Sequence, residues 1–121
     1  MAVTILTKKF AFRTYRLPLT TDGTAFLRVK PLTAEALHRF STNALAESGF
    51  DAEIAAAKML RQALCECVVG WQGLEDVNGE EIPFSQEAIE DICEADPSFA
   101  QAQYERIRRV AREAKLEEEK N

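Results

Sequence analysis

The sequence has little of what most enzymes, membrane proteins and secreted proteins require. It contains one histidine, one tryptophan and three cysteines among 121 residues. No apolar run approaches the roughly 20 residues of a membrane-spanning helix. The N-terminal stretch MAVTILTKKF has no basic region followed by a long apolar one, so we expect no secretory signal. An odd number of cysteines argues against a disulfide framework and for a reducing compartment. The sequence therefore predicts a cytoplasmic protein.

The residues that could carry catalysis or bind a metal form no recognisable pattern. His38 has only Glu35 as a same-face neighbour, whereas a general base needs an orienting partner and a nucleophile within reach. Cys65 and Cys67 point about 200° apart if they lie on a helix, so they cannot share a metal, and Cys93 is distant in sequence. Buried cysteines are common in protein cores. We therefore expect core cysteines, no catalytic residue, no metal site and no cofactor, and hence no enzyme.

The charge is distributed unevenly along a composition that is otherwise typical of a globular protein. Apolar residues make up 46% and charged residues 29% of the chain, and the length suits one domain. Residues 1–32 carry six basic groups against Asp22 alone, whereas residues 33–96 carry fourteen acidic and three basic groups. Residues 97–121 are nearly balanced. The asymmetry indicates either ends that match each other, a partner that recognises one pole, or ordinary solvated faces.

The first 32 residues favour β-structure. Residues 10–17, FAFRTYRL, are rich in aromatic residues and predict a strand, with a bulge near Arg13-Thr14. An Asp-Gly turn within residues 21–24 separates this strand from residues 25–30, in which apolar and basic residues alternate. The pattern predicts an N-terminal β-hairpin, with residues 3–6 as a candidate third strand.

From Thr33 the apolar spacing becomes helical. Thr33 is the expected N-cap of a helix over residues 34–46, and Asp51 that of a longer helix to Val69. Gly70 is expected to end this second helix in the left-handed conformation. The second helix is predicted as the central core element, because apolar residues at spacings of three and four form one stripe. That stripe comprises Ala57, Leu60, Leu64, Cys67 and Trp71.

Two further helices are expected after residue 85. Ser85 is a suitable N-cap for a helix over residues 86–95, and Asp96-Pro97 is a typical helix start, since proline is favoured at the first helical position. The final helix ends in a charged segment with three consecutive glutamates, residues 117–119. Negative charge near a helix C-terminus opposes the helix dipole, so we expect the last turns to fray.

A short ribbon connects the second and third predicted helices. Asn78-Gly79 is the preferred pair for a two-residue type I′ turn, here between residues 74–77 and 80–84. Pro83 lacks a backbone donor, which predicts a short ribbon at an edge. Trp71 and Phe84 are the expected anchors at its ends.

These elements predict one α+β domain, an N-terminal β-hairpin or small antiparallel sheet followed by about four helices, mostly α. Its expected regions are a β-hairpin region over 1–32, two helices over 33–69, a turn ribbon over 70–84, and two helices with a frayed charged tail over 85–121.

The stretch Val-Val-Gly-Trp-x-Gly-Leu-x-Asp-x-x-Gly-x-x-Ile-Pro-Phe-Ser resembles the tail assembly chaperones of long-tailed, siphovirus-like bacteriophages and prophages. The resemblance extends loosely to RLPLTTDGTAFLRVKPLT near the N-terminus. It implies a protein that binds the tape measure protein, assists tail tube assembly by recruiting tail tube protein, acts in the host cytoplasm and is absent from the mature particle. The resemblance leaves open whether the protein forms a homo-oligomer.

With this resemblance, the expected partner-binding residues are Trp71, Leu74, Ile82 and Phe84, although the same four residues would also suit a core. One alternative is another small phage structural or head–tail joining factor. A second is a regulatory or nucleic-acid-binding protein that uses the basic hairpin, with aromatic residues stacking on bases. The acidic block over 33–96 disfavours nucleic acid, because it would repel phosphates.

Overall fold

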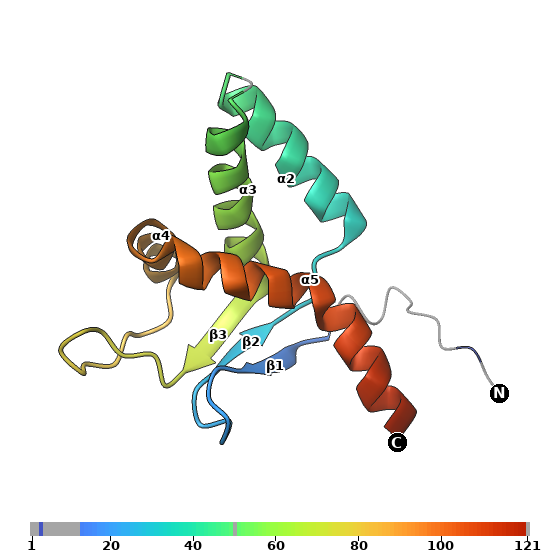
Figure 1. The fold of residues 1–121 in the computed structure, drawn as a ribbon, viewed down its shortest axis with the longest axis vertical. Coiled ribbons are helices and arrows are strands. Elements are labelled where there is room, and N and C mark those ends of the chain that lie inside the picture. The colour runs from blue at the N-terminus through green and yellow to red at the C-terminus, as the bar shows by residue number, and fades with distance from the viewer. Residues whose placement is uncertain (1–2, 4–12, 50, 121) are drawn as a thin grey trace.

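A computed structural model describes residue 3 and residues 13–49 and 51–120 (Figure 1). A three-stranded antiparallel sheet, in the order β1-β2-β3, is combined with four helices, so the predicted α+β class is confirmed. The helical hairpin of α2 and α3 projects away from the sheet, while α5 runs across one face of it (Figure 1). In chain order the elements are β1 (Tyr15–Pro18), β2 (Phe26–Val29), α2 (Ala34–Glu47), α3 (Ala52–Cys67), β3 (Val68–Gln72), α4 (Gln86–Ala95) and α5 (Pro97–Lys120).

The predicted N-terminal hairpin is formed by β1 and β2, in which Leu17 pairs with Leu27. Its turn is organised by Asp22, whose Oδ1 accepts hydrogen bonds from the Thr20 hydroxyl at 2.7 Å and from the Thr24 hydroxyl at 2.8 Å. These bonds, with one from the Thr24 backbone N–H, lower the pKa of Asp22 to about 2, because they stabilise the ionised carboxylate. The Asp-Gly turn is therefore confirmed.

One prediction for the β-region is wrong, and another lies mostly outside the described residues. The bulge predicted near Arg13-Thr14 is not formed, because both residues precede β1 and belong to no strand. The irregular register lies instead between Arg28 and Val29, where β2 pairs with β3. Apart from Val3, the candidate third strand over residues 3–6 lies outside the described residues, as do Phe10 and Phe12.

The third strand of the sheet is β3, a segment for which the sequence predicts a helix end. Helix α3 ends at Cys67, and Val68 is already extended, with φ −79° and ψ 118°. Gly70 does not take the expected left-handed conformation but pairs with Arg28 in the sheet, and the chain adopts a positive φ three residues later, at Gly73. Adjacent β-branched valines favour a strand, and β2 offers backbone groups to pair with. Trp71 therefore lies in a strand opposite Leu27 and not on the helical stripe.

All four predicted N-caps are confirmed, because each side-chain oxygen accepts a backbone N–H from the first turn of its helix. The acceptors are Thr33, Asp51, Ser85 and Asp96. A cap of this kind typically contributes about 1 kcal/mol. The charged C-terminal segment lies within α5, which continues to Lys120. The fraying of its last turns stays a prediction.

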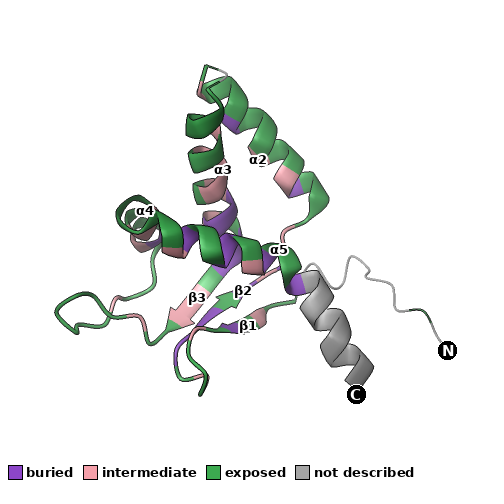
Figure 2. Ribbon diagram, viewed as in Figure 1, coloured by how far each residue is buried: buried purple, intermediate pink, exposed green. Residues whose placement is uncertain are grey.

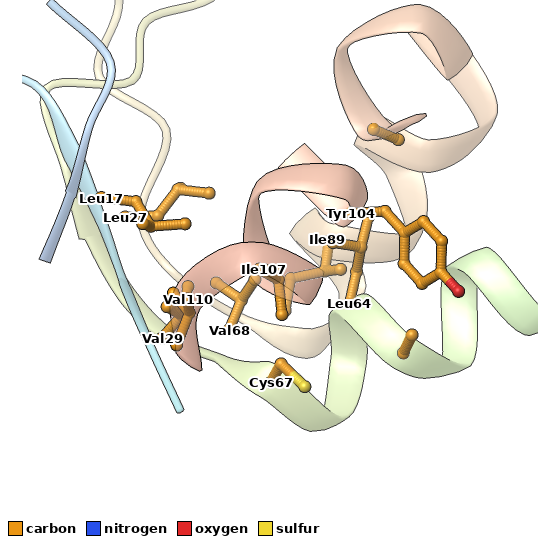
Figure 3. Close-up of a cluster of buried hydrophobic side chains, with 12 residues drawn as sticks. Leu17, Leu27, Val29, Leu64, Cys67, Val68, Ile89, Tyr104, Ile107 and Val110 are labelled. Atoms are coloured by element: carbon orange, nitrogen blue, oxygen red, sulfur yellow. The ribbon is translucent and has the colours of Figure 1, made fainter. Parts of the chain in front are cut away.

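The core lies between one face of the sheet and the helices α3, α4 and α5 (Figures 2 and 3). Buried residues concentrate where α5 crosses the inner half of α3 and the sheet, whereas most of the α2–α3 hairpin is exposed (Figure 2). Among the described residues, no helix is both long and apolar enough to cross a membrane. The labelled core residues in Figure 3 are Leu17, Leu27, Val29, Leu64, Cys67, Val68, Ile89, Tyr104, Ile107 and Val110.

Candidate partner-binding groove

The ribbon that follows β3 closes in a three-residue loop, not in the predicted two-residue type I′ turn. The Gly79 N–H donates to the Asp76 carbonyl at 3.0 Å, and the Asp76 N–H donates to the Glu80 carbonyl at 2.8 Å. The Asp76 carboxylate also accepts the N–H groups of Asn78 and Glu80. This carboxylate therefore selects the longer loop, and Gly79 supplies its positive φ of 79°. Only one isolated bridge, Glu75 to Glu81, pairs the two sides of the ribbon, so it is short as predicted.

Trp71 attaches the ribbon to the sheet. Its indole Nε1–H donates to the Ile82 carbonyl at 2.7 Å, and its ring meets the Phe84 ring edge-on at a centroid distance of 5.0 Å and an angle of 84°. Trp71 thus acts as the expected anchor, whereas Phe84 is 38% exposed and attaches to the ribbon through the Trp71 ring. The tryptophan contributes both a buried apolar surface and a donor, a combination that holds a polar backbone against a core.

Beneath Trp71 lies a small apolar cavity of ≈ 20 Å³ between β3, α3, α4 and α5. Leu74 and Trp71 both line it, together with Gln103. Gln103 is buried, and its side-chain carbonyl accepts a hydrogen bond from Arg106 at 3.1 Å. A space of this size holds little more than one water molecule. It is therefore a packing defect of the core and has no room for a substrate.

A larger groove of ≈ 370 Å³ opens between the ribbon and the junction of α4 and α5. Its lining is mostly apolar, and Val77 at the loop is fully exposed at 102% of its reference area. An exposed apolar surface that continues across several elements is typical of protein interaction sites. The apolar lining residues are Leu74, Val77, Ile82, Ile92, Ala95 and Phe99, and the acidic ones are Glu75, Asp76, Asp91 and Asp96.

The groove brings together two of the four predicted partner-binding residues. Leu74 and Ile82 line it, and Leu74 also reaches the cavity below. Trp71 lines only that cavity, and Phe84 is 38% exposed at the end of the ribbon without lining the groove. Whether any of the four contacts a partner stays a prediction.

The half of the groove that comes from α4 and α5 was not predicted from the sequence. Ile92, Ala95 and Phe99 line this half, and none of them was predicted to take part in binding. Their spacing of three and four residues continues one apolar stripe across the Asp96-Pro97 helix break. That continuity was the available signal, but only the fold shows that the stripe lies beside the ribbon.

The three cysteines lie in or beside the core. Cys67 is fully buried, and Cys65 and Cys93 are half-buried. Burial raises the pKa of the Cys67 thiol to about 12 and that of Cys93 to about 11, because desolvation disfavours the thiolate. Burial also raises the pKa of Cys65. In the part of the chain that is described, no cluster of three or more histidine, cysteine or acidic residues could hold a metal ion.

These raised pKa values predict slow reaction with thiol reagents. At pH 8 a thiol with a pKa of about 11, as for Cys93, is ionised to about a thousandth, against roughly a quarter for a free cysteine. We therefore expect Cys93 in the native chain to react with Ellman's reagent on the order of a hundredfold more slowly than free cysteine, and Cys67 more slowly still. All three thiols should react rapidly in denaturant. A thiol in the native chain that reacts at the rate of free cysteine would contradict the packing described above.

The aromatic residues described in the basic hairpin do not form the stacking platform that the nucleic-acid-binding alternative requires. Arg16 and Arg28 are cross-strand partners, and the Arg16 guanidinium lies 3.9 Å from the centre of the Phe26 ring. Phe26 is therefore covered and only 6% exposed, and Tyr15 is on the opposite, core-facing side of β1. Neither ring is open to a base, so these two residues offer no stacking surface to a nucleic acid, while Phe10 and Phe12 lie outside the described residues.

The molecule is thus a small α+β protein whose apolar groove is the most developed candidate site among the described residues. A comparison with protein families adds its origin, because the family described as YdaY prophage protein matches residues 28–121. The protein is of phage or prophage origin, as predicted. More particularly, the chain belongs to the YdaY prophage protein family. No curated protein and no solved structure matches it significantly.

Proposed function

We propose that this prophage protein is a tail assembly chaperone that binds the tape measure protein in the host cytoplasm and assists tail tube assembly, without catalytic activity. The observation that carries the proposal is the exposed apolar groove between the ribbon and the α4–α5 junction. Membership of a prophage family and the resemblance of residues 68–85 to tail assembly chaperones support the same assignment.

The groove suits the physical problem that such a chaperone solves. A long amphipathic helix exposes an apolar stripe until tube subunits cover it, and exposed stripes of this kind aggregate. A helix binds a groove through apolar side chains at positions i, i+3, i+4 and i+7. Leu74 and Ile82 on the ribbon, with Ile92 and Phe99 opposite them, offer an apolar surface for such anchors.

Co-expression tests the proposal. The tagged chain is produced with the longest coiled-coil-rich protein encoded by the same prophage, and soluble complex is measured by pull-down and light scattering. We expect the client to be soluble only with the chaperone. Val77→Asp should abolish its recovery, because the charge enters the apolar groove at an exposed site where folding is unaffected. Light scattering also reports whether the chain is a homo-oligomer.

A matched control is Ile54→Asp, which places the same charge at an exposed apolar residue of α3 that does not line the groove. It should leave the complex intact. A client that stays insoluble in the presence of the wild-type chain would contradict the chaperone assignment. Recovery of the chain from purified particles would instead support a structural or head–tail joining factor.

A further inference from the structure

We infer that the groove selects a helical segment whose apolar stripe is flanked by lysine or arginine residues. The inference rests on the proposed function, since it names the chemical class of the client segment that the groove accepts. It follows from the charged residues that line the groove, all of which are acidic.

The segment that builds most of the groove carries no basic residue. Residues 74–96 contain nine acidic groups and no lysine, arginine or histidine. The ion pairs found among the described residues are Lys30 with Glu66 and Lys58 with Glu47, so none of the nine carboxylates is neutralised within that part of the chain. A shallower, acidic hollow adjoins the groove along α4 and shares Ile82 and Asp91 with it. An apolar floor is thus bordered by uncompensated negative charge on both the ribbon and α4.

This arrangement favours one kind of occupant. A negatively charged rim repels acidic helices and nucleic acids, whereas it attracts cationic side chains and accelerates their association. Lysine and arginine also place their aliphatic stems along apolar surface while their charged ends reach outward. A helix with leucine or isoleucine anchors and basic flanks therefore satisfies the floor and the rim together.

Two of the four groove-lining carboxylates have structural roles, and two are available for a partner. Asp76 closes the ribbon loop and Asp96 caps α5, so neither can be replaced without disturbing the fold. Glu75 and Asp91 are exposed and line the groove. The double substitution Glu75→Gln and Asp91→Asn removes charge from both walls at nearly constant shape.

The test uses two synthetic helical peptides with the same leucine stripe, one with lysine and the other with glutamate at the flanking positions. Binding to the full chain is followed by fluorescence anisotropy at low and at high salt. The lysine peptide should bind more tightly than the glutamate peptide, and added salt should weaken it. Its dissociation constant should rise about three- to tenfold in Glu75→Gln/Asp91→Asn. The control Glu35→Gln/Glu53→Gln removes two exposed acidic groups of the α2–α3 hairpin that do not line the groove, and should bind as the wild type does.

Equal binding of both peptides, binding of neither, or an unchanged dissociation constant in the double variant would each overturn the inference. Failure of the proposed function has a different signature. If the client is captured on co-expression but the peptides show no charge preference, the inference alone fails. If the lysine peptide is preferred but no client is made soluble, the chaperone assignment fails and the charge selectivity stands.

Discussion

Gly73→Ala is expected to lower the free energy of unfolding by about 2–5 kcal/mol. Gly73 has a φ of +81°, a conformation that costs an alanine roughly 1–2 kcal/mol. A Cβ at this position would also lie 2.8 Å from the Ala25 Cβ and 2.9 Å from its Cα. The obstacle includes backbone, so it cannot rotate away as a flexible side chain could, and overpacking of this kind adds about 1–3 kcal/mol. Urea unfolding followed by circular dichroism measures the loss.

Gly79→Ala is the matched control, because Gly79 has nearly the same φ, +79°, but nothing within 4 Å of the added Cβ. It should lose only the conformational part, about 1–2 kcal/mol. Equal losses for the two variants would show that the close approach between Gly73 and the β1–β2 turn is absent in solution. The comparison bears on the groove, because Gly73 is the point at which the chain leaves the sheet and begins the ribbon.

The sequence predicted the features that depend on neighbours in the chain. The N-caps Thr33, Asp51 and Ser85 were correct because a cap is completed within three residues of the capping side chain. The Asp22 turn and the β1–β2 hairpin were likewise local, since turn chemistry and alternation fix both.

The features that depend on distant segments were missed. Leu64, Cys67 and Trp71 continue a helical spacing, so the local pattern favoured a helix through Val69. Val68–Gln72 forms a strand because it pairs with the edge of β2, about forty residues earlier in the chain. The helical spacing of apolar residues does not reveal this partner. The loop at Asn78-Gly79 was misjudged because the Asp76 side chain competes with the turn preference of the central pair.

The same distinction explains the partial prediction of the groove. Leu74 and Ile82 were named because they flank a recognisable turn, whereas Ile92 and Phe99 become part of the site only when α4 and α5 fold beside the ribbon. The acidic block was visible in the sequence, but its position around an apolar floor is a property of the fold.

Trp71→Ala is expected to lower the free energy of unfolding by about 2–4 kcal/mol. The substitution removes a large ring that packs on the core, for which losses of about 3–5 kcal/mol are typical when the ring is fully buried. It also leaves the Ile82 carbonyl without its donor. Trp71→Phe keeps most of the ring and should lose about 1 kcal/mol from the hydrogen bond alone. Denaturant unfolding followed by circular dichroism compares the variants.

Phe84→Ala separates the structural role from a role in binding. Phe84 is 38% exposed and meets Trp71 edge-on, a contact that contributes about 0.5–1.5 kcal/mol, so this variant should stay folded. A loss of client recovery by folded Phe84→Ala would therefore report a contact with the partner. Near wild-type stability of Trp71→Ala would contradict its role as the anchor of the ribbon and leave its ring free for the client. Because Trp71 holds Ile82 in place, we expect the tryptophan to affect binding through the groove that it supports, whereas an effect of the phenylalanine would act by direct contact.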